Sequence, residues 1–221
     1  MSEVSPSTGP IRGGTLLKLL GTNFDGGSQY LCGFNGTTTT QATLLAESAH
    51  TLSCSAPSTL PLGRLPLEVS LNGQDYSVSR VGFTVYSHPA VQSLCPSSGP
   101  SEGATFVTVS GMNMSVGSHL LCRFGSVLVN ASASTDVALT CISPPRSAGA
   151  VVPLEVSLNG QNFTSDGILF TYYTHGLPTE LCPSTGPAYG STAVRITAAS
   201  GANGSDYRVS LRGANGTLVV P

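Results

Sequence analysis

The sequence repeats itself with a period of 87 to 90 residues, and this repetition constrains the fold more firmly than any local propensity. The tetrapeptide Ser-Thr-Gly-Pro at residues 7–10 returns as Ser-Ser-Gly-Pro at 97–100 and unchanged at 184–187. The nonapeptide Pro-Leu-Glu-Val-Ser-Leu-Asn-Gly-Gln stands at both 66–74 and 153–161. The chain is therefore a tandem array of one duplicated unit.

We predict three units, named repeat 1 (residues 4–86), repeat 2 (residues 91–173) and repeat 3 (residues 177–221). Repeat 3 is only about half as long as the others. Half a unit would leave strand edges unpaired and part of a core uncovered. We therefore expect the natural protein to continue, or a neighbouring chain to supply the missing strands.

Apolar residues within each repeat alternate with polar ones, as at Leu67, Val69 and Leu71, and turn residues interrupt the runs. This period of two is typical of half-buried β-strands. The Asn-Gly pairs at 72–73 and 159–160 predict two-residue hairpins. We predict an all-β fold of tandem immunoglobulin-like β-sandwiches, two complete and a third partial.

The composition excludes several classes of partner. Only 9% of the residues are charged, the net charge is -2, and no two of the nine Lys and Arg residues are adjacent. Nucleic acid is therefore not an expected partner, because phosphate binding needs clustered cations. No segment approaches the roughly 20 apolar residues of a membrane-spanning helix, so we expect no membrane insertion by this segment. The residues at the start lack the apolar core of a signal peptide.

The order of the motifs in repeat 1 resembles the IPT/TIG domain family. Ser-Pro-Ser-Thr-Gly-Pro is followed by Gly-Gly-Thr, Gly-Thr-Asn-Phe, a Cys-Gly-Phe and finally Cys-x-x-Pro. Repeat 2 carries Cys-Arg-Phe-Gly at 122–125 and Cys-Ile-Ser-Pro-Pro at 141–145. The resemblance implies an immunoglobulin-like sandwich of the kind found in plexins, the hepatocyte growth factor receptor family and algal or protist surface proteins. Repeat 3 departs from the pattern, because Arg212 stands where the first Cys belongs.

Four of the six cysteines occupy equivalent places in repeats 1 and 2. Cys32 and Cys54 are 22 residues apart, and Cys122 and Cys141 are 19 apart. We predict two disulfide bonds, each contributing about 3 kcal/mol in the entropic model; the alternative is four buried free thiols. Oxidised cysteines favour an extracellular or cell-surface location.

Cys95 and Cys182 form a second group, each directly before the Pro-Ser-x-Gly-Pro motif of repeat 2 or repeat 3, where repeat 1 has Ser5. They lie one repeat apart. A repeat is roughly 30 Å across, whereas bridged Cα atoms lie about 4.4 to 6.8 Å apart. If the repeats stand end to end, these two cysteines cannot pair with each other. Either they are small buried residues of a first strand, or they bond to another chain or another part of this one.

Six of the nine asparagines stand in Asn-x-Ser/Thr sequons, where random placement would put about two. We expect at least three to carry N-linked glycans, which would hydrate a surface poor in charge. Ser and Thr runs are candidates for O-linked sugars. Asn35 and Asn215 precede Gly, so backbone turn geometry is an alternative reason for their presence. The sequon asparagines are Asn35, Asn113, Asn130, Asn162, Asn203 and Asn215.

No group of residues predicts chemistry. Residues 99–103 fit the G-x-S-x-G nucleophile elbow, but Ser101 aligns with Ile11 and Ala188 in the other repeats. The histidines and carboxylates lack metal-ligand spacing. Glu68 and Glu155 are expected to solvate a sheet face. We predict no enzyme activity, no catalytic or metal site and no cofactor.

The linkers between repeats are short, at 87–90 and 174–178, so the repeats should bend little relative to one another. We predict a non-enzymatic extracellular structural or adhesive glycoprotein: a rigid cell-surface stalk, fibre or coat component. The expected partners are other protein chains, including copies of this one, and glycans. The alternatives are the ectodomain stalk of a plexin-like receptor and an accessory module of a large secreted enzyme.

Overall fold

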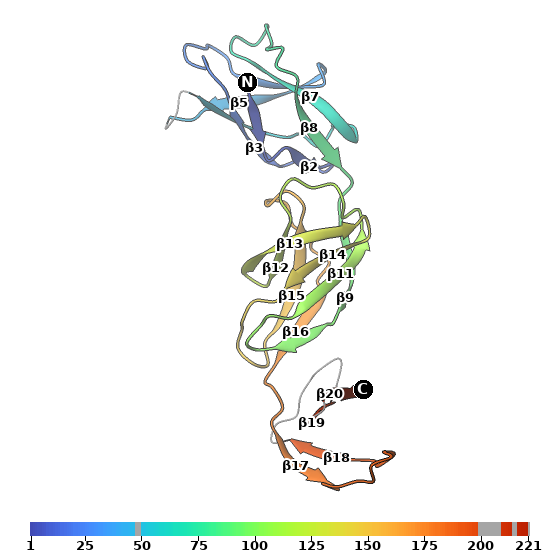
Figure 1. The fold of residues 1–221 in the computed structure, drawn as a ribbon. Coiled ribbons are helices and arrows are strands. Elements are labelled where there is room, and N and C mark those ends of the chain that lie inside the picture. Colours follow the sequence, from blue (N-terminus) through green and yellow to red (C-terminus); the bar gives the residue numbers. More distant parts are fainter. Residues whose placement is uncertain (47–49, 199–208, 214–215, 221) are drawn as a thin grey trace.

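The computed structural model describes residues 1–46, 50–198, 209–213 and 216–220. Figure 1 shows repeat 1, repeat 2 and the strands of repeat 3 following one another in an elongated row. The described residues contain strands and no helix, and therefore no apolar helix of membrane-spanning length. The prediction of an all-β immunoglobulin-like fold is confirmed.

Repeat 1 is a sandwich whose two layers share one strand, β5 (Thr38–Leu44). Residues 38–41 of β5 pair with β4, and residues 42–44 pair with β6. The strand order is β1-β3-β6-β5-β4-β7-β8-β2. The other strands are β1 (Glu3–Ser5), β2 (Thr8–Pro10), β3 (Leu16–Leu20), β4 (Leu31–Phe34), β6 (Thr51–Ser55), β7 (Gly63–Ser70) and β8 (Val81–Tyr86).

Repeat 2 has the same topology, with strand order β10-β16-β15-β12-β13-β14-β11-β9. β13 (Val127–Thr135) is the shared strand here, because it pairs with both β12 and β14. The other strands are β9 (Ala90–Cys95), β10 (Ser98–Pro100), β11 (Phe106–Met112), β12 (Leu121–Phe124), β14 (Ala138–Ile142), β15 (Val151–Ser157) and β16 (Leu169–Tyr173).

Repeat 3 contributes two separate antiparallel pairs, β17 with β18 and β19 with β20. In sequence order these strands correspond to β1, β3, β4 and β5 of repeat 1. Their bounds are β17 (Pro178–Cys182), β18 (Arg195–Ala198), β19 (Val209–Gly213) and β20 (Gly216–Val220).

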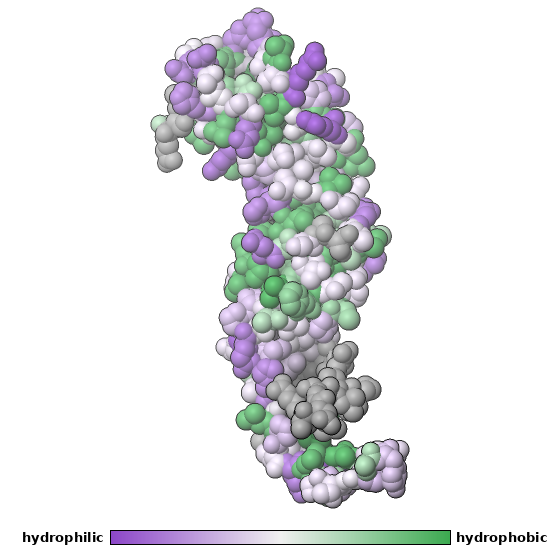
Figure 2. Space-filling view, viewed as in Figure 1, coloured by the Kyte–Doolittle hydropathy of each residue, from purple (hydrophilic) through white to green (hydrophobic). Residues whose placement is uncertain are grey.

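Each complete repeat has a hydrophobic core of its own, and alternation along the strands builds it. In β3, Leu17 and Leu19 are fully buried while Leu16 and Leu20 are exposed. Burying one such side chain contributes about 1.5–3 kcal/mol. Figure 2 shows that hydrophobic side chains also remain on the outer surface. Phe106 in repeat 2, for example, is 70% exposed.

The predicted two-residue hairpins at 72–73 and 159–160 are wrong. Ser70 bridges to Tyr76, so a longer loop encloses the first pair, and repeat 2 has the equivalent bridge. Only the glycine of each pair takes a positive φ, 77° and 76°. The side-chain oxygen of Asn72 instead accepts two backbone N–H groups farther along the loop, which is an Asx turn.

The expectation that Glu68 solvates a sheet face is wrong. Its carboxylate instead holds this loop in place through hydrogen bonds. Its carboxylate accepts hydrogen bonds from the hydroxyls of Ser77 and Ser79 and from the backbone N–H of Arg80. Burial alone would raise the pKa of Glu68, but these hydrogen bonds outweigh burial and hold the pKa below its usual value. Glu155 accepts equivalent hydrogen bonds in repeat 2. Each repeat therefore uses one carboxylate to fix the loop after β7 or β15.

Candidate functional site: the joint between repeats 1 and 2

The connection between repeats 1 and 2 is short and its ends are anchored. β8 ends at Tyr86 and β9 begins at Ala90. Tyr86 belongs to the last strand of repeat 1, yet its ring packs in the core cluster of repeat 2 and is 4% exposed. Burial raises the pKa of its hydroxyl well above the usual value. The last strand of repeat 1 therefore contributes one aromatic side chain to the core of repeat 2.

Figure 1 shows the end of repeat 1 that faces repeat 2. This end carries buried hydroxyl groups and an unpaired strand edge. Thr8 and Thr15 are buried there, at 8% and 0% exposure. The β1–β3 ladder stops at the pair Ser5 and Lys18. The next residue is a proline, which has no N–H to continue the ladder. The backbone N–H and C=O of Leu16 are consequently available to another partner.

The facing loop of repeat 2 is fixed from within its own repeat. Glu155 is 5% exposed and accepts hydrogen bonds from the Thr164 hydroxyl, the Asp166 N–H (3.2 Å) and the Gly167 N–H (3.0 Å). The side-chain oxygen of Asn159 accepts the N–H groups of residues 161 and 162. The loop is thus held in one shape independently of its contact with repeat 1.

Asn159 is the centre of the contact and is 3% exposed. Its Nδ2 donates to the carbonyl oxygen of Thr8 (3.3 Å) and to Oγ1 of Thr15 (3.2 Å). Oγ1 of Thr15 in turn donates to Oδ1 of Asn162 (2.7 Å). Buried polar groups of both repeats are therefore satisfied by each other, and separating the repeats would leave them unpaired until water entered.

Gln161 binds the free strand edge. Its Oε1 accepts the N–H of Leu16 (3.0 Å), and its Nε2 donates to the C=O of Leu16 (2.9 Å). A side-chain amide carries one donor and one acceptor, as a peptide group does, so it substitutes here for a missing neighbouring strand. Ser118 adds a further contact, because its N–H donates to Oγ1 of Thr8 (3.2 Å) and its hydroxyl lies 2.9 Å from the same atom.

We call this set of contacts the joint. It comprises Thr8, Thr15 and Leu16 of repeat 1, with Ser118, Asn159, Gln161 and Asn162 of repeat 2.

Hydrogen bonds also hold the linker and the start of β9 against the rest of repeat 2. Nδ2 of Asn113 donates to the carbonyl oxygen of His88 (3.1 Å), and the Asp166 carboxylate accepts the N–H of Val91 (2.7 Å). Burial lowers the pKa of His88, and the charge of Arg12 lowers it further, while Asp166 opposes both. His88 is consequently held neutral next to the joint.

The structure contains disulfide bonds between Cys32 and Cys54 and between Cys122 and Cys141, with Cα atoms 6.5 and 6.4 Å apart. Each joins the two layers of its sandwich, β4 to β6 or β12 to β14. Cys95 is unpaired and exposed on β9, so the interpretation of this residue as a buried side chain is wrong.

Cys182 is also unpaired and exposed, on β17. Strand β17 pairs only with β18 among the described strands, and all its residues are exposed. The alternative in which Cys182 is a buried residue of the first strand is therefore not what the structure shows.

The sequon asparagines are spread over different surfaces. Asn35, Asn113 and Asn130 are exposed, and Asn162 is half-buried in the joint. Asn203 and Asn215 lie outside the described residues. Glycosylation at any of these positions remains a prediction.

No pattern in the sequence predicted the contact between repeats 1 and 2. Recurrence between repeats could have indicated these residues. Thr8 and Thr15 recur as Ser98 and Thr105, and the Asn-Gly-Gln motif of the repeat-2 loop also stands in repeat 1. The described residues contain no group of three His, Cys, Asp or Glu side chains that would hold a metal ion.

Comparison with known proteins agrees with this structure. The model of the IPT/TIG domain matches residues 1–85 and 89–172. The chain is 26% identical to human Plexin-A3 over 204 residues, which are 89% of this chain and 11% of that protein. It is also 26% identical to mouse Plexin-B2 over 209 residues, again 89% of this chain and 11% of the relative.

A solved structure of the full extracellular region of Plexin A4, domains 1 to 10, shares the fold. It has a TM-score of 0.53 and 19% identity, and it covers 82% of this chain and 16% of that one. The similarity to the two plexin sequences and the two disulfides place the chain outside the cell or at its surface. Because the domain model covers both complete repeats, the chain belongs to the IPT/TIG domain family.

Proposed function

We propose that the chain is a rigid spacer within the extracellular part of a plexin-like cell-surface protein. It sets the distance and orientation between the domains on either side of it, and it performs no catalysis. The observation that carries the proposal is the joint, in which side chains of repeat 2 satisfy buried polar groups and a strand edge of repeat 1. Only three residues, 87–89, connect β8 to β9. A linker this short, together with these contacts, restricts bending between repeats 1 and 2.

The similarity to plexin ectodomains favours the receptor stalk over the structural fibre or the enzyme module, since the matches span 89% of the chain. The relatives are far longer than this chain, so its ligands and its place in the whole protein belong to the proposal. Interaction with other protein chains is expected through the domains that the spacer positions.

A crosslinked fibre or coat is a second candidate, and one observation favours it. Cys95 and Cys182 are both unpaired and exposed, in equivalent positions of successive repeats. Exposed thiols in an oxidising compartment are available to bond between chains. High-mass species on a non-reducing gel that disappear on reduction would support this candidate; a monomer in both lanes would remove it.

Single-molecule fluorescence transfer tests the spacer proposal. The unpaired thiols are first removed by Cys95→Ser and Cys182→Ser. Dyes are then attached to new cysteines at two exposed positions, Gln41→Cys in repeat 1 and Leu128→Cys in repeat 2. A rigid joint gives one narrow distance distribution. Combined Asn159→Ala and Gln161→Ala should broaden it. A distribution already broad before these substitutions would contradict the proposal.

A further inference from the structure

A hollow between repeats 1 and 2 lies beside the linker, and we call it the linker hollow. Its volume is about 290 Å³. Leu62 of repeat 1, Ser87 of the linker, and Asn113 and Val116 of repeat 2 are among the residues that line it. Repeats 1 and 2 each have a complete set of strands, so the linker hollow is a feature of the junction between two whole sandwiches.

Exposed apolar side chains form part of the walls of the linker hollow. Leu62, directly before β7, is 53% exposed, and Val116, in the loop between β11 and β12, is 44% exposed. Contact with an apolar group would remove this surface from water, which is favourable. Small-molecule pockets begin at about 300 Å³, so the linker hollow has room for one small ring rather than for a segment of another protein.

Asn113 lines the linker hollow and begins the sequon Asn-Met-Ser. The surrounding contacts fix its position. The side chain of Met114 is fully buried in the core of repeat 2, and the hydroxyl of Ser115 donates to the Asp136 carboxylate at 2.7 Å. Nδ2 of Asn113, the atom that carries an N-linked sugar, lies 3.1 Å from the carbonyl oxygen of His88. The attachment point is therefore held beside the linker.

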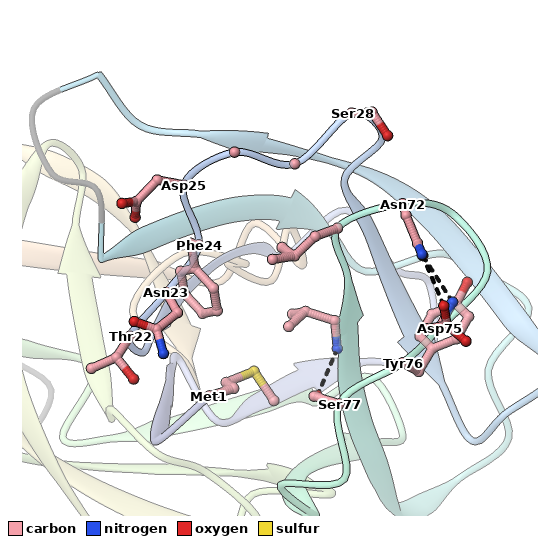
Figure 3. A pocket seen from close by; sticks show the side chains of 14 residues that line it. Met1, Thr22, Asn23, Phe24, Asp25, Ser28, Asn72, Asp75, Tyr76 and Ser77 are labelled. Carbon is pink, nitrogen blue, oxygen red and sulfur yellow. Dashed lines mark hydrogen bonds between the residues drawn. The ribbon is translucent and has the colours of Figure 1, made fainter.

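The same turn in repeat 1 separates the backbone role of the asparagine from the role of the sequon. Figure 3 shows this turn, with Asn23, Phe24 and Asp25 in the places of residues 113–115. Asn23 and Asn113 both have a φ of 59°, which asparagine tolerates well, so turn geometry accounts for an asparagine in each repeat. It does not account for Ser115, because repeat 1 forms the turn with Asp25 and has no sequon there.

We propose that Asn113 carries an N-linked glycan whose first sugar occupies the linker hollow and contacts Leu62 of repeat 1 and Val116 of repeat 2. The first sugar of such a glycan, N-acetylglucosamine, presents C–H groups and an acetyl methyl to these apolar walls, and its hydroxyls remain in water. Attachment replaces one of the two hydrogens on Nδ2 of Asn113, so the other still donates to the carbonyl oxygen of His88.

The sugar acts as an additional contact between the two repeats. It is bound covalently to repeat 2 and meets Leu62 of repeat 1 only while the repeats keep the orientation seen in the structure. Bending at the linker would return the apolar surfaces of Leu62 and Val116 to water, so the sugar stabilises that orientation. This inference rests on the proposed spacer function, to which it adds a modification that strengthens the junction.

NMR of the full, isotope-labelled chain secreted from eukaryotic cells tests the proposal. An endoglycosidase first trims every glycan to a single N-acetylglucosamine. We expect nuclear Overhauser contacts from the acetyl methyl on Asn113 to the methyl groups of Leu62 and Val116. Ser115→Ala abolishes the sequon, so these contacts should be lost. Asp136→Ala removes the same Ser115–Asp136 hydrogen bond but keeps the sequon, so it is the matched control in which the contacts persist.

A second variant tests the wall that repeat 1 supplies. Leu62→Ser leaves the glycan attached, as peptide mass confirms, but should weaken the contact between the acetyl methyl and Val116. Leu169→Ser, at another exposed leucine outside the linker hollow, should leave that contact unchanged. An unmodified Asn113, or a sugar whose acetyl methyl contacts neither wall, would overturn the proposal. The spacer proposal would survive that result, since its own test uses substitutions at Asn159 and Gln161.

Discussion

The side-chain amide of Gln161 makes two hydrogen bonds to one residue of the preceding repeat, accepting from the N–H of Leu16 at 3.0 Å and donating to its C=O at 2.9 Å. A proline after Ser5 ends the β1–β3 ladder and leaves that strand edge open. The proline that follows β1 therefore determines where repeat 2 attaches to repeat 1.

Removing the Thr15 hydroxyl should weaken the joint. Thr15→Val keeps the shape of the side chain but leaves Oδ1 of Asn162 and Nδ2 of Asn159 each without one partner. We expect a loss of about 1–3 kcal/mol in unfolding free energy, measured by urea titration. Thr105→Val at the equivalent, half-buried position of repeat 2 is the control. Equal losses for both substitutions would argue against a specific role for Thr15.

Loss of one disulfide should destabilise one repeat. The Cys122 and Cys141 bridge closes a loop with a sequence separation of 19 residues, so replacing both with Ala should cost repeat 2 about 3 kcal/mol. Repeat 1 keeps its own bridge and core. Two separate unfolding transitions should then appear in calorimetry, and replacing Cys32 and Cys54 should reverse their order. A single undisplaced transition would contradict this expectation.

Acid should weaken the fold through His88. Its pKa is lowered in the folded protein, chiefly by burial, so the unfolded chain binds the proton more readily. Stability should fall as the pH drops below about 6.5, the unperturbed value, until the folded pKa is passed. His88→Gln should reduce this loss. Unfolding free energies of both proteins at pH 7.5 and 5.5 measure the difference, and an identical loss in the variant would exclude His88 as the cause.

Glu155→Gln should loosen the loop that carries Asn159 and Gln161. The substitution replaces one acceptor oxygen with an NH₂ group that faces the donors Thr164, Asp166 or Gly167. Because Glu155 is 5% exposed, we expect a loss of about 1–3 kcal/mol. Hydrogen exchange should also rise in residues 158–167. A variant as stable as the parent protein would show that the carboxylate does not fasten the loop.

Glycans should occupy at least three of the six sequons when the chain is secreted from animal cells. Asn130 lies exposed on β13 and Asn35 on the exposed turn after β4. Intact mass before and after enzymatic deglycosylation counts the occupied sites, and Asn130→Gln should remove one glycan. An unshifted mass would contradict this prediction.

Patterns within each repeat, together with their recurrence in the next repeat, were sufficient to predict the fold. The alternation at Leu67, Val69 and Leu71 predicted a strand with one face toward the core, and Leu67 and Val69 are buried there, because strand period and burial are both local properties. Equivalent cysteine positions likewise indicated the pairs that the structure joins.

The joint was not predictable in this way. Asn159 and Thr8 are 151 residues apart, and no spacing rule relates them. Gln74 and Gln161 have the same sequence surroundings, yet only Gln161 contacts another repeat in the structure. The hydrogen bonds from Glu155 to its loop were also not predicted. In the sequence, a carboxylate that faces solvent from a strand cannot be distinguished from one that binds a neighbouring loop.

Amide hydrogen exchange at Leu16, followed by NMR, tests the joint most directly. The account predicts that this N–H is protected in the intact chain and that Gln161→Ala accelerates its exchange about tenfold or more, while the amide of Leu19 inside the β3 ladder is unchanged. An amide of Leu16 that exchanges freely in the intact chain, or equally slowly with and without Gln161, would contradict the account.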